Sequence, residues 1–143
     1  MTEARLPFFV YGTLRRGQRN HALLAGRTLS WTPARLPGAL LYPGPGYPFA
    51  VADPLGAAVV HGDLVRVAAD VYPRVLADLD RLETYTPGDP GNLYERERRT
   101  VTTERGPAEA WVYLANGPLA DELRAEGRPI AGGDWLTAAR HGL

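Results

Sequence analysis

A glycine-bounded segment that follows the first apolar run contains residues that could bind a ligand. Residues 8–11 are apolar and too few for a helix, so they are predicted to form a buried strand that ends at Gly12. Gly17 closes the segment, and no proline between the two glycines removes a backbone N–H donor. Successive N–H groups in such a turn can form a concave nest that holds a carboxylate. An ordinary loop after a strand has the same pattern, so both interpretations stay open at this point.

Glu83 is the carboxylate whose surroundings best suit acid–base chemistry. It follows Leu82, the last apolar residue of a predicted helix, where the helix dipole disfavours negative charge. Asp80 lies three residues earlier on a neighbouring face of the same helix. Burial, the dipole and the second carboxylate are each expected to raise the pKa of Glu83 toward that of a useful general base. A solvated charge at the end of a helix is the alternative interpretation.

The composition excludes several other chemistries. The chain has no Cys and no Lys, which rules out thiolate nucleophiles, disulfides, cysteine metal sites and Schiff bases. Its three histidines, His21, His61 and His141, show no metal-ligand spacing, so a metal site is not expected. The sequence also lacks a GxSxG nucleophile motif and the lysine of a phosphate-binding loop.

Charge and hydropathy limit the partners and the location. The formal net charge is zero, so the chain has no overall attraction to nucleic acid or to acidic membranes, and neither is an expected partner. No segment approaches the roughly 20 apolar residues of a membrane span, and no signal peptide is visible. A cytoplasmic protein with a single domain over residues 1–143 is therefore expected. Arg15 and Arg16 are expected to be solvated surface side chains.

The elements that position these residues are mostly strands. Strands are predicted over residues 8–11, 28–42 with interruptions, 49–52, 58–67, 94–103 and 108–115. The last two form a hairpin with Gly106 and Pro107 as its turn. The best helix covers residues 70–83 with Asp70 as its cap, and weaker helical segments cover residues 20–26, 118–126 and 134–140, the last capped by Asp134. This pattern favours an α+β domain with a partly closed barrel.

Five short segments, in this order and spacing, resemble the γ-glutamylcyclotransferase-like family and its bacterial γ-glutamylamine cyclotransferase-type members. They are Val10-Tyr11-Gly12-Thr13-Leu14-Arg15-Arg16-Gly17, Pro45-Gly46-Tyr47-Pro48-Phe49, Val60-His61-Gly62-Asp63-Leu64, Leu79-Asp80-Arg81-Leu82-Glu83-Thr84-Tyr85 with Tyr94-Glu95-Arg96, and Ala110-Trp111-Val112-Tyr113. The resemblance runs from residue 8 to about residue 115, and the rest of the chain carries little of it. It implies an α+β fold, a small mixed β-barrel with flanking short helices.

The resemblance also implies a reaction and its residues. In the family's enzymes the α-amine of a γ-glutamyl group attacks its own γ-carbonyl, which closes 5-oxoproline and releases an amine or an amino acid. One carboxyl group and a substrate-binding loop would carry this reaction, with tyrosines near the pocket. The residues so assigned are the catalytic Glu83 and the substrate-binding Tyr11, Gly12, Thr13, Leu14, Tyr94 and Tyr113.

Several alternatives stay open beside this assignment. The family's chemistry implies a small-molecule γ-glutamyl substrate, no cofactor, and a protein that acts as a monomer or a homodimer. A catalytically idle member that binds a small carboxylate ligand or a partner is the alternative function. Tyr94 and Tyr113 are equally suited to core packing with satisfied hydroxyls. The loop over residues 86–93 is expected to border the pocket and to influence the leaving group, which stays open.

Overall fold

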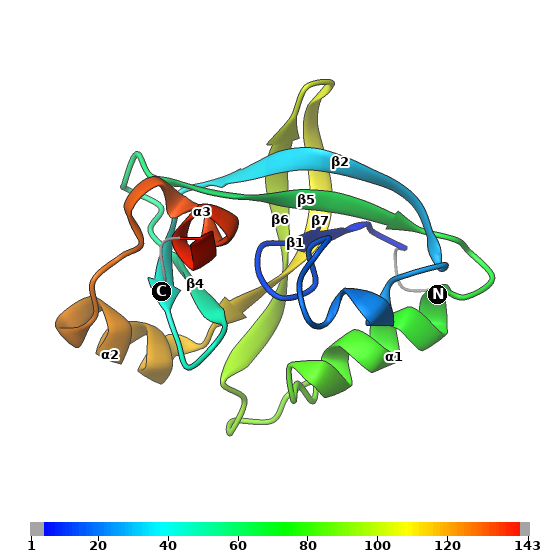
Figure 1. The fold of residues 1–143 in the computed structure, drawn as a ribbon. Helices are drawn as coiled ribbons and strands as arrows, with labels where there is room; N and C mark the ends of the chain where they lie inside the picture. Colours follow the sequence, from blue (N-terminus) through cyan, green and yellow to red (C-terminus); the bar gives the residue numbers. More distant parts are fainter. Residues whose placement is uncertain (1–4, 141–143) are drawn as a thin grey trace.

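The computed structural model describes residues 5–140 and is built on a closed barrel of five strands (Figure 1). These strands are β1 (Phe8–Val10), β2 (Thr28–Pro37), β5 (Val59–Val67), β6 (Tyr94–Thr103) and β7 (Gly106–Ala115). They follow the order β1-β5-β2-β6-β7, and a parallel pairing of β1 with β7 completes the ring. The other neighbours are antiparallel, so the barrel is mixed, as the resemblance implied. It is closed rather than partly closed, because β1 bridges β5 and β7.

The core lies on both sides of β1, because successive side chains of a strand point to opposite faces. Phe8 and Val10 belong to an apolar cluster that includes the buried face of the long helix. Phe9 and Tyr11 belong to a second cluster, together with residues from β2, β3, β5 and β7. The short first strand therefore joins two parts of the core, and the segment after it starts from a fixed position.

A hairpin of two strands lies beside the barrel. It consists of β3 (Ala39–Pro43) and β4 (Pro48–Ala52), which pair antiparallel. Gly38 separates β2 from β3 with a φ of 70°, a left-handed conformation that glycine adopts readily, so the interruption predicted within residues 28–42 falls there. The glycine- and proline-rich turn between β3 and β4 brings Tyr47 and Pro48 toward the end of the long helix, as described below.

The helix α1 (Tyr72–Leu82) packs its apolar face against the barrel. Val75 and Leu79 are fully buried on this face, as the helical spacing of the apolar residues predicts. Tyr72 in the first turn stacks on Phe8 of β1, with 5.5 Å between the ring centroids. These contacts fix the direction of α1 and therefore the place where it ends.

The predicted cap of this helix is wrong. Val71, not Asp70, occupies the N-cap position, and it makes no side-chain hydrogen bond to the helix. The N–H of Tyr72 instead donates to the carbonyl of Ala69 in the preceding turn, and Pro73 has no N–H that needs an acceptor. Fewer free donors remain at this end, so a side-chain cap has less to satisfy.

The remaining helices are short and lie outside the barrel (Figure 1). They are η1 (His21–Leu23), α2 (Gly117–Glu126), η2 (Ala131–Gly133) and α3 (Trp135–Arg140). Asp134 caps α3 as predicted, because its carboxylate accepts a hydrogen bond from the N–H of Leu136 at 3.1 Å. The β6–β7 hairpin is confirmed, but its turn is Glu104–Arg105 and β7 already begins at Gly106, which pairs with Thr103.

No helix over residues 5–140 is long and apolar enough to cross a membrane. His141, one of the three histidines of the chain, lies outside the described residues.

Candidate active site

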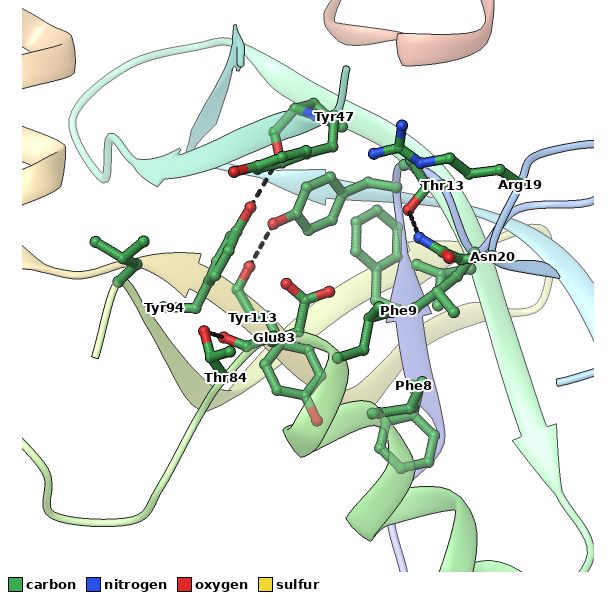
Figure 2. A pocket seen from close by; sticks show the side chains of 18 residues that line it. Phe8, Phe9, Thr13, Arg19, Asn20, Tyr47, Glu83, Thr84, Tyr94 and Tyr113 are labelled. Atoms are coloured by element: carbon green, nitrogen blue, oxygen red, sulfur yellow. Dashed lines mark hydrogen bonds between the residues drawn. The ribbon is translucent and has the colours of Figure 1, made fainter. Parts of the chain in front are cut away.

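A cavity of about 310 Å³ lies between the end of α1, the segment after β1, the β3–β4 turn and strands β6 and β7 (Figure 2). Its volume is at the lower end of the range for small-molecule sites, roughly 300–1,000 Å³. All seven residues assigned from the sequence line it, namely Tyr11, Gly12, Thr13, Leu14, Glu83, Tyr94 and Tyr113. The fold thus brings them together around one space, while their roles in binding and catalysis remain predictions.

Glu83 stands at the C-cap of α1, and its side chain projects into the cavity (Figure 2). A Schellman motif ends the helix here: the N–H of Tyr85 donates to the carbonyl of Asp80 at 2.7 Å, and that of Thr84 to Arg81 at 3.1 Å. Thr84 takes the left-handed position with a φ of 50°, which costs a residue other than glycine about 1–2 kcal/mol. This turn holds the Glu83 carboxylate at the cavity wall.

Burial raises the pKa of Glu83 from 4.5 to about 7. Its side chain is partly buried, and within residues 5–140 its carboxylate has no hydrogen-bond donor or ion-pair partner. Asp80 was expected to contribute like charge, but it is paired with Arg96 at 3.1 Å and accepts a hydrogen bond from the Tyr113 hydroxyl at 2.6 Å. A carboxyl with a pKa near neutrality can both accept and donate a proton under physiological conditions.

The segment after β1 forms a compact turn at the cavity. The side-chain amide of Asn20 donates to the Thr13 hydroxyl at 2.8 Å, and the backbone N–H of Asn20 donates to the Thr13 carbonyl at 2.9 Å. The N–H of Arg15 donates back to the Gly12 carbonyl at 3.1 Å. The N–H groups of Thr13 and Leu14 donate to no acceptor in the described part of the chain. Both residues line the cavity, and N–H groups without an internal acceptor suit an anionic ligand.

Gly12 is required by packing within the protein. A Cβ at this position would lie 2.8 Å from Cδ of Pro48, at the start of β4. The backbone of Gly12 does not need glycine's conformational freedom, because its φ is not positive. Gly17 does need glycine's freedom, since its φ is 81°. The glycine-bounded pattern therefore has two separate physical causes, one at each end.

The hydroxyl groups of the three tyrosines assigned to the site each donate a hydrogen bond to another group of the protein. Tyr11 donates to the carbonyl of Tyr113 at 2.5 Å, Tyr94 to that of Pro48 at 3.2 Å, and Tyr113 to Asp80. Burial raises the pKa of all three hydroxyls well above the usual range, and the negative charge of Glu83 raises it further. The tyrosines therefore stay protonated, and their rings form walls of the cavity.

Arg15 is buried, so the prediction of a solvated side chain is wrong. It is 9% exposed, and its guanidinium donates to Asp63 of β5 and to Asp134, both at 3.0 Å. Because Asp134 also caps α3, Arg15 links the turn after β1 to the barrel and to the end of the described chain. Arg16 is exposed, as predicted, and its guanidinium lies 5.2 Å from the ring centroid of Trp31.

Other lining residues had no assigned role in the site. Tyr47 stands in the β3–β4 turn, within a segment that carried the resemblance, and that placement was its only signal in the sequence. Asn20 was interpreted as a helix cap, and no pattern distinguished Arg19 beside it. Leu93 is the lining residue that comes from the loop expected to border the pocket.

Over residues 5–140 the protein is a small mixed barrel in which a partly buried carboxylate, Glu83, lines the same cavity as the turn after β1. Residues 8–137 match the family described as gamma-glutamyl cyclotransferase, AIG2-like. The chain belongs to this family, which confirms the resemblance seen in the sequence.

Similar proteins are known from several organisms, some of them as solved structures. The chain is 36% identical over 109 residues to the gamma-L-glutamyl-butirosin B gamma-glutamyl cyclotransferase of Niallia circulans; the match covers 76% of this chain and 65% of that protein. YkqA of Bacillus subtilis is similar in structure with a TM-score of 0.69 and 25% identity, over 95% of this chain and 41% of YkqA. An AIG2-like protein of Mus musculus shares the fold at 19% identity, with a TM-score of 0.66 over 96% and 92% of the two chains. The chain therefore spans less than two thirds of the length of the Niallia circulans protein and of YkqA.

Proposed function

We propose that this protein is a γ-glutamyl cyclotransferase that acts on a γ-glutamyl amine or a γ-glutamyl peptide. The observation that carries the proposal is the Glu83 carboxylate, which has a raised pKa and lines the same cavity as the free N–H groups of Thr13 and Leu14. Membership of the gamma-glutamyl cyclotransferase, AIG2-like family supports this reaction class. The relative in Niallia circulans carries the activity in its name.

In the proposed reaction the substrate supplies its own nucleophile. Ionised Glu83 removes a proton from the α-ammonium, and the freed amine attacks the γ-carbonyl carbon. The new N–C bond closes a five-membered ring, and the bond from the same carbon to the leaving nitrogen breaks. Protonated Glu83 gives its proton to that nitrogen. Ionised again, Glu83 takes the second proton, which the ring nitrogen loses as the amide forms, and passes it to the released amine. The products are 5-oxoproline and an amine or amino acid in its ammonium form. A pKa of about 7 suits this exchange with an α-amine of pKa roughly 8 better than an ordinary glutamate does.

The protein contributes mainly by positioning. The N–H groups of Thr13 and Leu14 are proposed to bind the α-carboxylate, which places the α-amine on the side of Glu83. A correctly oriented intramolecular attack has an effective molarity as high as about 10⁵–10⁸ M, so no protein nucleophile is needed. Tyr11, Tyr94 and Tyr113 are proposed to shape the cavity around the γ-glutamyl group with their rings.

A panel of γ-glutamyl amines and γ-glutamyl dipeptides tests the proposal, with 5-oxoproline measured by mass spectrometry. Wild-type protein should release 5-oxoproline from at least one member. Glu83→Gln should abolish release while circular dichroism shows an unchanged fold. Glu122→Gln, on the exposed side of α2, removes an equal charge far from the cavity and should retain full activity.

Two outcomes contradict the proposal in different ways. Near-wild-type rates in Glu83→Gln show that the base is wrongly assigned, although the reaction could still be correct. Binding of γ-glutamyl compounds without any turnover by wild-type protein identifies the catalytically idle alternative instead.

A further inference from the structure

We propose that Arg19 selects leaving groups that carry a carboxylate, so that a γ-glutamyl amino acid is a better substrate than a γ-glutamyl amine of similar size. The inference rests on the proposed function and specifies the part of the substrate that the sequence left open. Arg19 is a specificity-determining residue in this proposal and takes no part in the proton transfers.

Arg19 is a cation at the edge of the cavity without a carboxylate partner. Its side chain lines the cavity and is exposed, and no acidic group within residues 5–140 forms an ion pair with it. Other arginines of the protein are paired: Arg15 with Asp63 and Arg27 with Asp78, each at 3.0 Å. Arg19 is therefore free to bind an anionic group of a ligand.

The Arg19 guanidinium lies against the β3–β4 turn. Nη1 of Arg19 lies 3.1 Å from the point where a Cβ of Gly46 would stand. The guanidinium therefore lies close to the Gly46 backbone, in space that the side chain of a larger residue would occupy. Tyr47, the next residue, packs edge-on against Phe49 with 5.4 Å between ring centroids and forms an apolar wall beside the charge. Figure 2 shows the guanidinium at the same edge of the cavity as Tyr47.

The charge of Arg19, together with the N–H donors already available to the α-carboxylate, assigns this cation to the leaving group. Figure 2 shows Arg19 and Glu83 at different sides of the lined space, with Thr13 on the side of Arg19. The proposed α-carboxylate site already has two free N–H donors, at Thr13 and Leu14. A second carboxylate, on the departing amino acid, would meet the unpaired guanidinium, while a leaving group with an additional ammonium would be repelled.

Three substrates with the same γ-glutamyl part test the inference: γ-glutamyl-alanine, γ-glutamyl-ethylamide, which lacks the carboxylate, and γ-glutamyl-ethylenediamine, which adds a positive charge. For wild-type protein we expect kcat/KM to be about tenfold higher for the alanine derivative than for the ethylamide, as for a charge-assisted contact at a partly solvated site. Arg19→Gln should lower kcat/KM for the alanine derivative about tenfold and change that for the ethylamide less than about twofold.

Two further variants separate a local contact from a general charge effect. Arg16→Gln removes the same charge from the same segment, but Arg16 lies against Trp31 and does not line the cavity, so all three rates should stay unchanged. Arg19→Glu should reverse the preference and favour the ethylenediamine derivative over the alanine derivative.

The results distinguish this inference from the proposed function. An equal loss for all three substrates in Arg19→Gln overturns it, because Arg19 would then bind the common γ-glutamyl part. Equal wild-type rates on the alanine derivative and the ethylamide also overturn it, while 5-oxoproline release still supports the cyclotransferase. If wild-type protein forms no 5-oxoproline from any of the three or from the wider panel, the proposed function fails and the inference fails with it.

Discussion

Glu83 should reduce the stability of the folded protein at neutral pH, and replacing it with glutamine should relieve this cost. The carboxylate loses hydration at the cavity wall, and no donor within the described residues compensates it. Burial therefore favours the protonated form in the folded state, whereas the unfolded chain ionises Glu83 at the ordinary pKa of 4.5.

The size and the sign of the effect follow from the two pKa values. A rise from 4.5 to about 7 corresponds to about 3 kcal/mol, at about 1.36 kcal/mol per pH unit. Below pH 4.5 Glu83 is protonated in both states and has no effect. As the pH rises from 4.5 to about 7, the unfolded state loses the Glu83 proton first. The free energy of unfolding therefore falls over this range and levels off above it. Because the side chain is only partly buried, we expect about 1–3 kcal/mol.

Urea unfolding of wild-type protein and Glu83→Gln, at several values between about pH 4 and pH 8, measures this effect. The other titrating groups are the same in both proteins and cancel in the difference. The variant should gain about 1–3 kcal/mol over the wild type as pH rises across this window. Glu122→Gln should show a difference that does not change with pH, because this residue is exposed.

A difference between Glu83→Gln and wild type that is independent of pH would refute the reasoning. It would show that the carboxyl titrates alike in the folded and unfolded states, and the argument for Glu83 as a base near neutrality would lose its physical foundation. If this difference shows the expected pH dependence and also a constant offset at every pH, the offset reflects only how well the glutamine side chain packs.

Three other substitutions test the packing around the site. Gly12→Ala should cost about 1–3 kcal/mol in urea unfolding, because its Cβ would press on Pro48, whereas Gly117→Ala, with open space around the added carbon, should cost little. Arg15→Gln should cost about 3–5 kcal/mol by the same measurement, because it leaves the partly buried carboxylates of Asp63 and Asp134 without their shared partner; a loss below about 1 kcal/mol would show that these ion pairs stabilise the fold little. Thr84→Gly should raise the melting temperature, since relief of the left-handed strain gains about 1–2 kcal/mol and the flexibility of glycine removes about half of it; a lower melting temperature would show that the threonine contacts outweigh the strain.

The sequence by itself determined the local features of this protein. Helical spacing placed Val75 and Leu79 on the buried face of α1, and β-branched and aromatic runs located the strands. These features depend on neighbours along the chain and are visible in a single sequence. Short motifs in order also indicated the family and the residues around the cavity, because the turn after β1 and the end of α1 are each continuous segments.

Only the tertiary structure decided which charges are paired and which remain free. Arg15, Arg16 and Arg19 stand close together in one polar segment and have the same side chain. The fold brings Asp63 and Asp134 to Arg15, from 48 and 119 positions away, and Trp31 to Arg16, and leaves Arg19 at the cavity edge. The closure of the barrel and the burial of Glu83 likewise depend on contacts between distant segments. A local pattern specifies where a charge lies along the chain, but its pKa and its partner depend on what packs around it in space.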